Sequence, residues 1–271
     1  AISRVRVHPS KPEVAFVAVS GDLWTKGGER GLYRTADGGK SWTKVLSAAA
    51  PDDADTGCVD VVLSPADPNV VYAALYARRR TPYSFTYGPS LTGGRDAGGV
   101  FRSTDGGATW KKLTNGLPPQ AGRIGLAVTP ANPKVVMAVV QSDAGGTSGI
   151  DEIESRAGGV FRSEDGGDTW VRASRLDPRP FYFSQIRIDP VNDARVYVLG
   201  YALAVSDDGG KSWREDLFGK VHPDCHELVV AGTPAPRHPV PPKEGEPPEP
   251  EKKPVSPRLL LPEDLNKEVF L

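Results

Sequence analysis

The sharpest group of polar residues in this chain is the segment HPDCHE, residues 222–227. It places His222, Asp224 and His226 at alternate positions, and alternate residues of a strand point to the same side. Two imidazoles and a carboxylate held together can bind zinc or another divalent metal and leave positions open for water or substrate. The pattern indicates a metal site; the alternative is a hydrogen-bonded cluster that only fixes the entry of the strand.

A second group consists of three acids, Asp151, Glu152 and Glu154, within residues 141–159. Glycoside hydrolysis needs two carboxyl groups roughly 5–10 Å apart, one acting as acid and the other as base or nucleophile. The same composition is common in solvated loops. This cluster is therefore a candidate catalytic site, with an ordinary polar loop as the alternative.

Residues 77–99 combine arginines with aromatic residues at alternate positions. If this segment is extended, the three aromatic rings point the same way. Such rings stack on sugars or anchor a peptide, and guanidinium groups hold carboxylates. A ligand-binding loop is one hypothesis; a loop that its aromatic residues merely pin to the protein body is the other. The residues concerned are Arg79, Arg80, Tyr83, Phe85 and Tyr87.

A further stretch, RPFYFS at residues 179–184, leads into an apolar strand just as HPDCHE leads into the next one. We expect Arg179 and Tyr182 to border the same central pocket as the metal-site candidates. Arg123 and Asp60, near the starts of two earlier apolar strands, are weaker candidates for that rim.

The elements that must position these residues are marked by a repeated octapeptide. It reads TADGGKSW at 35–42, STDGGATW at 103–110, SEDGGDTW at 163–170 and SDDGGKSW at 206–213. A repeated fold needs the same turn in every unit, whereas four copies of one catalytic centre are not expected. Its glycines accept positive φ, and its aspartate can accept backbone N–H bonds. We therefore predict a structural role for Asp37, Trp42, Asp105, Trp110, Asp165, Trp170, Asp208 and Trp213.

Each octapeptide lies in a unit of four short apolar strands. Two β-branched runs joined by a proline turn come first, as in VDVVLSPADPNVVYAAL, followed by a third strand such as GGVFRS. A fourth strand, such as TKVL or KKL, follows the tryptophan. Four strands per repeat without helical periodicity indicate an all-β fold, a β-propeller of four-stranded blades.

The octapeptides resemble the Asp-box, or bacterial neuraminidase repeat, of sialidases, xyloglucanases and the sortilin luminal domain. This resemblance implies that the box is the turn between the third and fourth strands of a blade, and in sialidases it lies away from the active site. The pattern of a sialidase is poorly met, because no arginine triad with a nucleophilic tyrosine can be assigned.

Longer stretches, including YARRRTPYSF and VHPDCHEL, resemble secreted bacterial Asp-box propellers described as sortilin-like or glycosyl-hydrolase-like. The resemblance implies a secreted or periplasmic protein. In those relatives the last motif reads His-x-Asp-His-His, and Cys225 stands here in place of the middle histidine.

Four full repeats and a partial fifth are expected within residues 1–230. Residues 231–257 are rich in proline and predict an extended loop or linker. Residues 258–271 contain RLLL and EVFL, which predict either strands of a fifth blade or a docking tail. A closed five-bladed ring and part of a larger propeller both remain open, so the rest of such a propeller is one candidate partner.

Composition excludes several classes of function. The 271 residues carry a net charge of −1, so no global field favours nucleic acid or an anionic membrane. No apolar run is long enough to span a membrane. The two cysteines give neither a metal-site spacing nor a disulfide framework. The chain starts without Met or a leader, which we interpret as a processed protein or a piece of a longer one.

Three insertions, at residues 25–31, 77–99 and 141–159, interrupt the connection between second and third strands. In a propeller these connections lie on the face opposite the boxes, where loops on a rigid scaffold commonly bind ligands. The main hypothesis is a module that binds a glycan, a peptide or a partner protein on this face. The alternative is a glycoside hydrolase or metal-assisted hydrolase with its site at the channel mouth, and a third is a plain scaffold.

Overall fold

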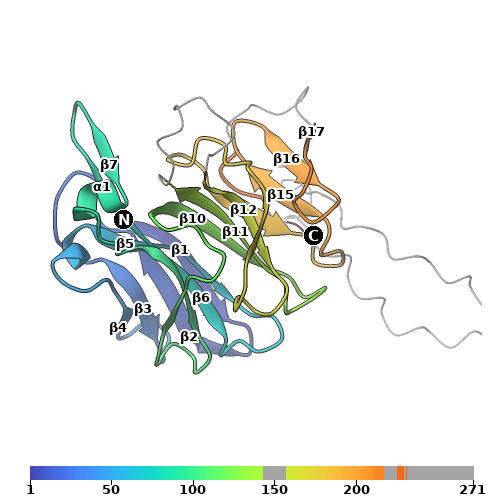
Figure 1. The fold of residues 1–271 in the computed structure, drawn as a ribbon. Coiled ribbons are helices and arrows are strands. Elements are labelled where there is room, and N and C mark those ends of the chain that lie inside the picture. Colours follow the sequence, from blue (N-terminus) through green and yellow to red (C-terminus); the bar gives the residue numbers. More distant parts are fainter. Residues whose placement is uncertain (143–156, 217–224, 229, 231–271) are drawn as a thin grey trace, which may run out of the picture.

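The computed structural model describes residues 1–142, 157–216, 225–228 and 230 of the chain, and Figure 1 shows four twisted sheets that succeed one another around a common centre. Each sheet is one blade, and its strands follow in sequence order. The innermost strands are β1 (Ile2–His8), β5 (Thr56–Leu63), β10 (Ala121–Val128) and β14 (Gln185–Ile188). The prediction of an all-β propeller built from four-stranded blades is confirmed.

The outer strands have nearly the bounds that the repeats predict. The second strands are β2 (Lys11–Val19), β6 (Val71–Arg80), β11 (Val136–Ser142) and β15 (Val196–Leu199). The third strands are β3 (Gly31–Thr35), β8 (Gly99–Ser103), β12 (Gly159–Ser163) and β16 (Leu203–Ser206). The fourth strands are β4 (Thr43–Leu46), β9 (Lys111–Leu113), β13 (Val171–Ser174) and β17 (Arg214–Asp216). Blade 2 also carries β7 (Phe85–Tyr87), which pairs with β6, a 3₁₀ turn η1 (Asp52–Ala54) and a short helix α1 (Pro89–Thr92).

Each box is a turn closed by its own side chains. In the second box, Ser103 donates its hydroxyl proton to Asp105, and Asp105 accepts both the backbone N–H and the hydroxyl of Thr109. These bonds, the Thr109 hydroxyl first, lower the pKa of Asp105 to about 2. The same bonds recur at Asp37, Asp165 and Asp208. The box aspartates are thus occupied in holding the turn.

The second, third and fourth boxes are also tied to the turn between the first and second strands of their blades, and the first box is tied to Glu13 on β2. The first box glycine donates its N–H to a carbonyl there, as Gly106 does to Asn69 at 2.9 Å and Gly166 to Lys134 at 2.9 Å. The second glycine has positive φ, and a Cβ on Gly107 would lie 2.9 Å from the Phe16 ring of the blade before it. Only glycine fits this turn against its neighbour.

The core lies between successive blades rather than within one. One cluster joins Phe16 and Leu32 of blade 1 to Val61 of blade 2, with Trp110 packed against it. Equivalent clusters join blades 2 and 3 through Trp170, and blades 3 and 4 through Trp213. In blades 2, 3 and 4 the ring of the box tryptophan thus packs against the preceding blade.

Blade 1 has no preceding blade among the described residues. The side chains that pack against the preceding blade in blades 2, 3 and 4 are therefore exposed to solvent in blade 1. Trp42 is 42% exposed whereas Trp170 is 4% exposed. Val5 stands four residues before the turn proline, as do Val61, Leu126 and Ile186 in the other blades; Val5 is exposed and its three counterparts are buried. On the far side of blade 4, Leu199 and Leu203 are covered by Cys225, Leu228 and Val230.

A network of charged side chains joins the inner strands across the propeller centre. Arg4 on β1 donates to Asp60 on β5 at 3.1 Å, to Glu227 at 3.0 Å, and to Gln185 on β14. Asp60 also accepts the Leu126 N–H of β10 at 2.9 Å. Two carboxylates thereby link four blades and the segment after them.

Candidate functional site

Three segments that lie far apart in the sequence meet on the face opposite the boxes. They are the connection between β2 and β3, the hairpin of β6 and β7, and the connection between β13 and β14. Arg80, at the end of β6, lies 5.4 Å from the ring centre of Trp24 and 5.6 Å from that of Phe181. The Arg80 N–H also bonds the Leu23 carbonyl at 2.8 Å. Two of the three insertions expected on one face thus do gather there.

The aromatic side chains of these segments form a continuous row. The ring centres of Phe85 and Phe181 are 4.0 Å apart, and those of Phe85 and Tyr87 are 5.4 Å apart. Phe181 contacts Tyr182 edge to face at 4.6 Å. The row continues through Phe183 to the ring of His226, 5.0 Å away. We call the set of Trp24, Arg80, Phe85, Tyr87, Phe181 and Tyr182 the aromatic face.

The outer part of the aromatic face is open to solvent. Trp24 is 53% exposed and Tyr182 is 44% exposed, while Phe85 and Tyr87 are half-buried beneath them. The guanidinium of Arg179 lies 5.0 Å from the Tyr182 ring centre. Exposed rings beside two arginines can stack on apolar sugar faces and donate hydrogen bonds to hydroxyl or carboxylate oxygens.

Two of the expected binding residues, Arg79 and Arg123, make their polar contacts within the protein. Arg79 forms an ion pair with Asp55, because its side chain points to the opposite side of β6 from Arg80. Arg123 donates to the Phe181 carbonyl, and burial lowers the pKa of its guanidinium group. Arg123 therefore supports the aromatic face from beneath.

The expectation that three alternate rings point the same way is wrong for Tyr83. The segment is not extended there, because the chain turns between Thr81 and Ser84, whose backbone groups bond at 2.8 Å. Tyr83 stands at the tip of this turn and is 98% exposed, whereas Phe85 and Tyr87 lie on β7 within the aromatic row.

The loop that carries Trp24 is held by a buried arginine. Arg30 is 2% exposed and donates to four backbone carbonyls, those of Ser20, Asp22, Thr25 and Gly27. Asp22 in turn accepts the N–H groups of Trp24 and Thr25. Trp24 is thus presented by a loop whose polar groups are satisfied internally.

The connection that carries Phe181 and Tyr182 has an unusual backbone. Arg179 and Ser184 both have positive φ, at 41° and 51°, although neither is glycine. Just before them lies Asp177, 3% exposed, and its Oδ1 has no hydrogen-bond partner within the described part of the chain. Desolvation raises the pKa of Asp177 to about 8, so this carboxyl is protonated at neutral pH. Strained backbone and unsatisfied buried groups concentrate at functional sites.

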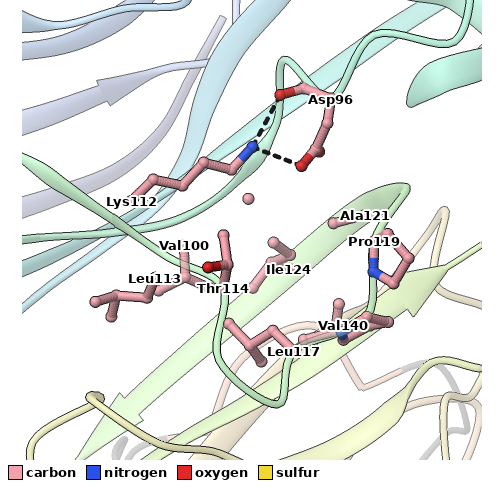
Figure 2. A pocket seen from close by; sticks show the side chains of 12 residues that line it. Asp96, Val100, Lys112, Leu113, Thr114, Leu117, Pro119, Ala121, Ile124 and Val140 are labelled. Carbon is pink, nitrogen blue, oxygen red and sulfur yellow. Dashed lines mark hydrogen bonds and ion pairs between the residues drawn. The ribbon is translucent and has the colours of Figure 1, made fainter.

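A separate cavity lies between blades 2 and 3. It has a volume of about 290 Å³ and is lined mainly by apolar side chains, including Val100, Leu117, Ile124 and Val140. Figure 2 shows Lys112 reaching across its upper side to Asp96, with the Nζ–Oδ2 distance at 2.8 Å. The ion pair occupies the two charged groups of the lining, so the cavity offers mainly apolar contacts.

Several of the expected site residues lie outside the described residues. They are the acids Asp151, Glu152 and Glu154 and the metal-site candidates His222 and Asp224. The described residues contain no group of three potential metal ligands. His226 is described and is exposed at the end of the aromatic row. Within the same ranges no disulfide forms, and no helix is long and apolar enough to cross a membrane.

Sequence reasoning missed Trp24 and Phe181. Trp24 directly precedes the insertion at 25–31, and Phe181 lies inside RPFYFS, so each stood beside a segment that was considered. The signal that could have found them is a large aromatic residue next to a glycine-rich or proline-rich connection on the same face.

Comparisons with known proteins agree with this architecture. Residues 101–112 match the family model described as BNR/Asp-box repeat. A probable oligoxyloglucan-reducing end-specific xyloglucanase of Neosartorya fischeri is 28% identical over 198 residues, 73% of this chain and 19% of that protein. A xyloglucanase of Hypocrea jecorina is 31% identical over 154 residues, 53% of this chain and 15% of that protein. The chain thus spans less than a fifth of the length of these relatives.

Solved structures show the same fold. The crystal structure of a GH74 xyloglucanase from Xanthomonas campestris matches 84% of this chain and 32% of its own, with a TM-score of 0.55 and 20% identity. A GH74 enzyme of Niastella koreensis matches 85% of this chain and 33% of its own, with a TM-score of 0.52 and 21% identity. At this identity the likeness establishes the fold alone. The chain thus carries a BNR/Asp-box repeat at residues 101–112, and its four-stranded sheets fold as blades of a β-propeller.

Proposed function

We propose that this chain is a glycan-binding part of a β-propeller protein and that the aromatic face is its binding surface. The observation that carries the proposal is the convergence of three connections on Arg80, which lies between the rings of Trp24 and Phe181. Side chains from blade 1, blade 2 and the connection between blades 3 and 4 would not meet there without the propeller.

The chemistry of the aromatic face suits a carbohydrate. Exposed rings offer flat apolar surfaces, and Arg80 and Arg179 offer donors for ring-substituent oxygens. The similarity to xyloglucanases favours a plant-type β-glucan over a peptide as the ligand. The protein would act outside the cytoplasm, where such polysaccharides are found, and the rest of a larger propeller is its proposed partner.

Binding of xyloglucan oligosaccharides, measured by isothermal titration calorimetry, tests the proposal. Trp24→Ala and Tyr182→Ala should each weaken binding about tenfold, the loss expected when about 1.4 kcal/mol of stacking is removed. Trp42→Ala is the matched control, because Trp42 is comparably exposed but belongs to the first box on the other face. Equal binding by the wild type, Trp24→Ala and Tyr182→Ala would contradict the proposal.

A second candidate function is glycoside hydrolysis, which the names of the relatives favour. Within the described ranges, three carboxyls near the aromatic face are engaged elsewhere. Asp22 accepts the N–H groups of Trp24 and Thr25, Asp55 pairs with Arg79, and Asp177 is buried and protonated. Hydrolysis would therefore depend on Asp151, Glu152 or Glu154. Release of reducing ends from xyloglucan by the wild type, and its loss in Glu152→Gln or Glu154→Gln, would establish it.

A further inference from the structure

The box-side end of the propeller centre contains a second cavity, distinct from the aromatic face. Its volume is about 350 Å³, and the inner strands of all four blades line it. Arg6, Val62, Ala127 and Arg187 occupy the same position in the four blades, three residues before the turn proline. Two guanidinium groups therefore reach one cavity whose other lining is mostly apolar.

The carboxylates near this cavity are already engaged by other arginines. Asp60 accepts from Arg4 and from the backbone N–H groups of Val61 and Leu126. Glu227 forms ion pairs with both Arg4 and Arg187. Among the described residues, three guanidinium groups (Arg4, Arg6 and Arg187) thus face two carboxylates, which leaves one positive charge in excess.

Of these three arginines, Arg6 is the one without a carboxylate contact in the part of the chain that the structure describes. Its only hydrogen bond there is from Nη1 to the Val5 carbonyl, at 3.4 Å. Burial, followed by the charge of Arg4, lowers the pKa of Arg6, and the opposing effect of Asp60 does not reverse this shift. The pKa of Arg4, by contrast, is raised on balance by Asp60 and Glu227. A half-buried charge beside like charges is stabilised when an anion joins it.

We infer that this cavity binds a small organic monocarboxylate, whose carboxylate pairs with Arg6 and whose apolar body packs against Val62, Leu126 and Ala127. Among the described residues, the lining contains no carboxylate that would repel the ligand. A planar guanidinium with free donors matches a carboxylate in two parallel hydrogen bonds. The apolar walls contribute through burial of hydrocarbon surface, so a longer or aromatic carboxylate binds more tightly than acetate.

Calorimetric titration of the wild-type chain with benzoate tests this site, with benzamide as the neutral ligand of the same shape. Benzoate should bind with a saturable signal and benzamide should bind at least about tenfold more weakly, because a hydrogen-bonded ion pair contributes about that much. Arg6→Gln should reduce benzoate affinity by a similar factor. Arg172→Gln removes an exposed arginine of β13 and should leave the affinity unchanged.

A second measurement covers the case in which Arg6→Gln does not fold. Benzoate should shift the Arg6 Nε–Hε resonance of the wild-type chain in a ¹H–¹⁵N spectrum, and it should leave most other arginine resonances in place. Equal affinity for benzoate and benzamide, unchanged affinity in a folded Arg6→Gln, or an unmoved Arg6 resonance would each overturn the assignment.

Discussion

Among the described residues, Trp110, Trp170 and Trp213 pack against the preceding blade and Trp42 does not, which predicts unequal effects of the same substitution in different repeats. Trp170 is 4% exposed and Trp42 is 42% exposed. For an aromatic side chain of roughly 250 Å², this difference corresponds to roughly 95 Å² of surface, or about 2.4 kcal/mol at 25 cal/mol per Å². We expect Trp170→Ala to lower the free energy of unfolding by about 4 kcal/mol, and Trp42→Ala by about 1.5 kcal/mol.

The comparison is well matched because both indoles donate a hydrogen bond to a box glycine, Trp42 to Gly39 and Trp170 to Gly167. Loss of that bond is common to the two variants and cancels in the difference. Urea unfolding followed by far-ultraviolet circular dichroism measures both, without relying on the fluorescence of the residue removed. Equal destabilisation by the two variants would refute the reasoning, because it would show that the ring stabilises its own turn and not the contact between blades.

Three further predictions concern titratable groups. Asp177 keeps its proton in the folded chain up to pH about 8 but ionises near pH 4 when the chain is unfolded. The free energy of unfolding should therefore decrease as the pH rises from about 4 to about 8, by up to about 1.4 kcal/mol per pH unit. Asp177→Asn should flatten that part of the profile in urea titrations, and an unchanged slope would exclude the buried acid as its source. Hydrogen bonds lower the pKa of Asp105 to about 2, so its stabilisation should be complete above pH 4 and lost as pH falls towards 2. Acid unfolding of Asp105→Asn, compared with the wild type, should show less loss over that window. Burial raises the pKa of Cys58, so in the native chain a thiol reagent should modify Cys225, which is half-buried, well before Cys58; rapid labelling of Cys58 would show that blade 2 opens.

The repeated units were predictable from the sequence because one local pattern specifies each of them. Asp105 and Thr109, separated by a fixed spacing, close the turn through their own hydrogen bonds, and strand alternation does the rest. Such bonds lie within a few residues, so they can be predicted without knowledge of the fold.

The candidate site was only partly predictable because it depends on contacts between distant segments. That Phe85 would stack on Phe181 follows from neither segment alone, since the contact needs blades 2, 3 and 4 in place. The positive φ of Arg179 and Ser184 carries no sequence signal, because neither residue is glycine. Tyr83 was misjudged for the opposite reason: a local turn at Thr81 interrupted an alternation that continues only in β7.

The short fourth strands have a consequence for solubility. β4, β9, β13 and β17 are the last strands of their sheets, and an edge strand offers backbone groups with which another chain can pair. Each has only three or four residues and carries a basic side chain, namely Lys44, Lys112, Arg172 or Arg214. A second copy of the chain that pairs with such a strand would form only a few backbone hydrogen bonds. Its own basic side chain would also be repelled by the basic side chain of the strand. The rim of the propeller can therefore stay exposed in concentrated solution without seeding aggregates through its sheets.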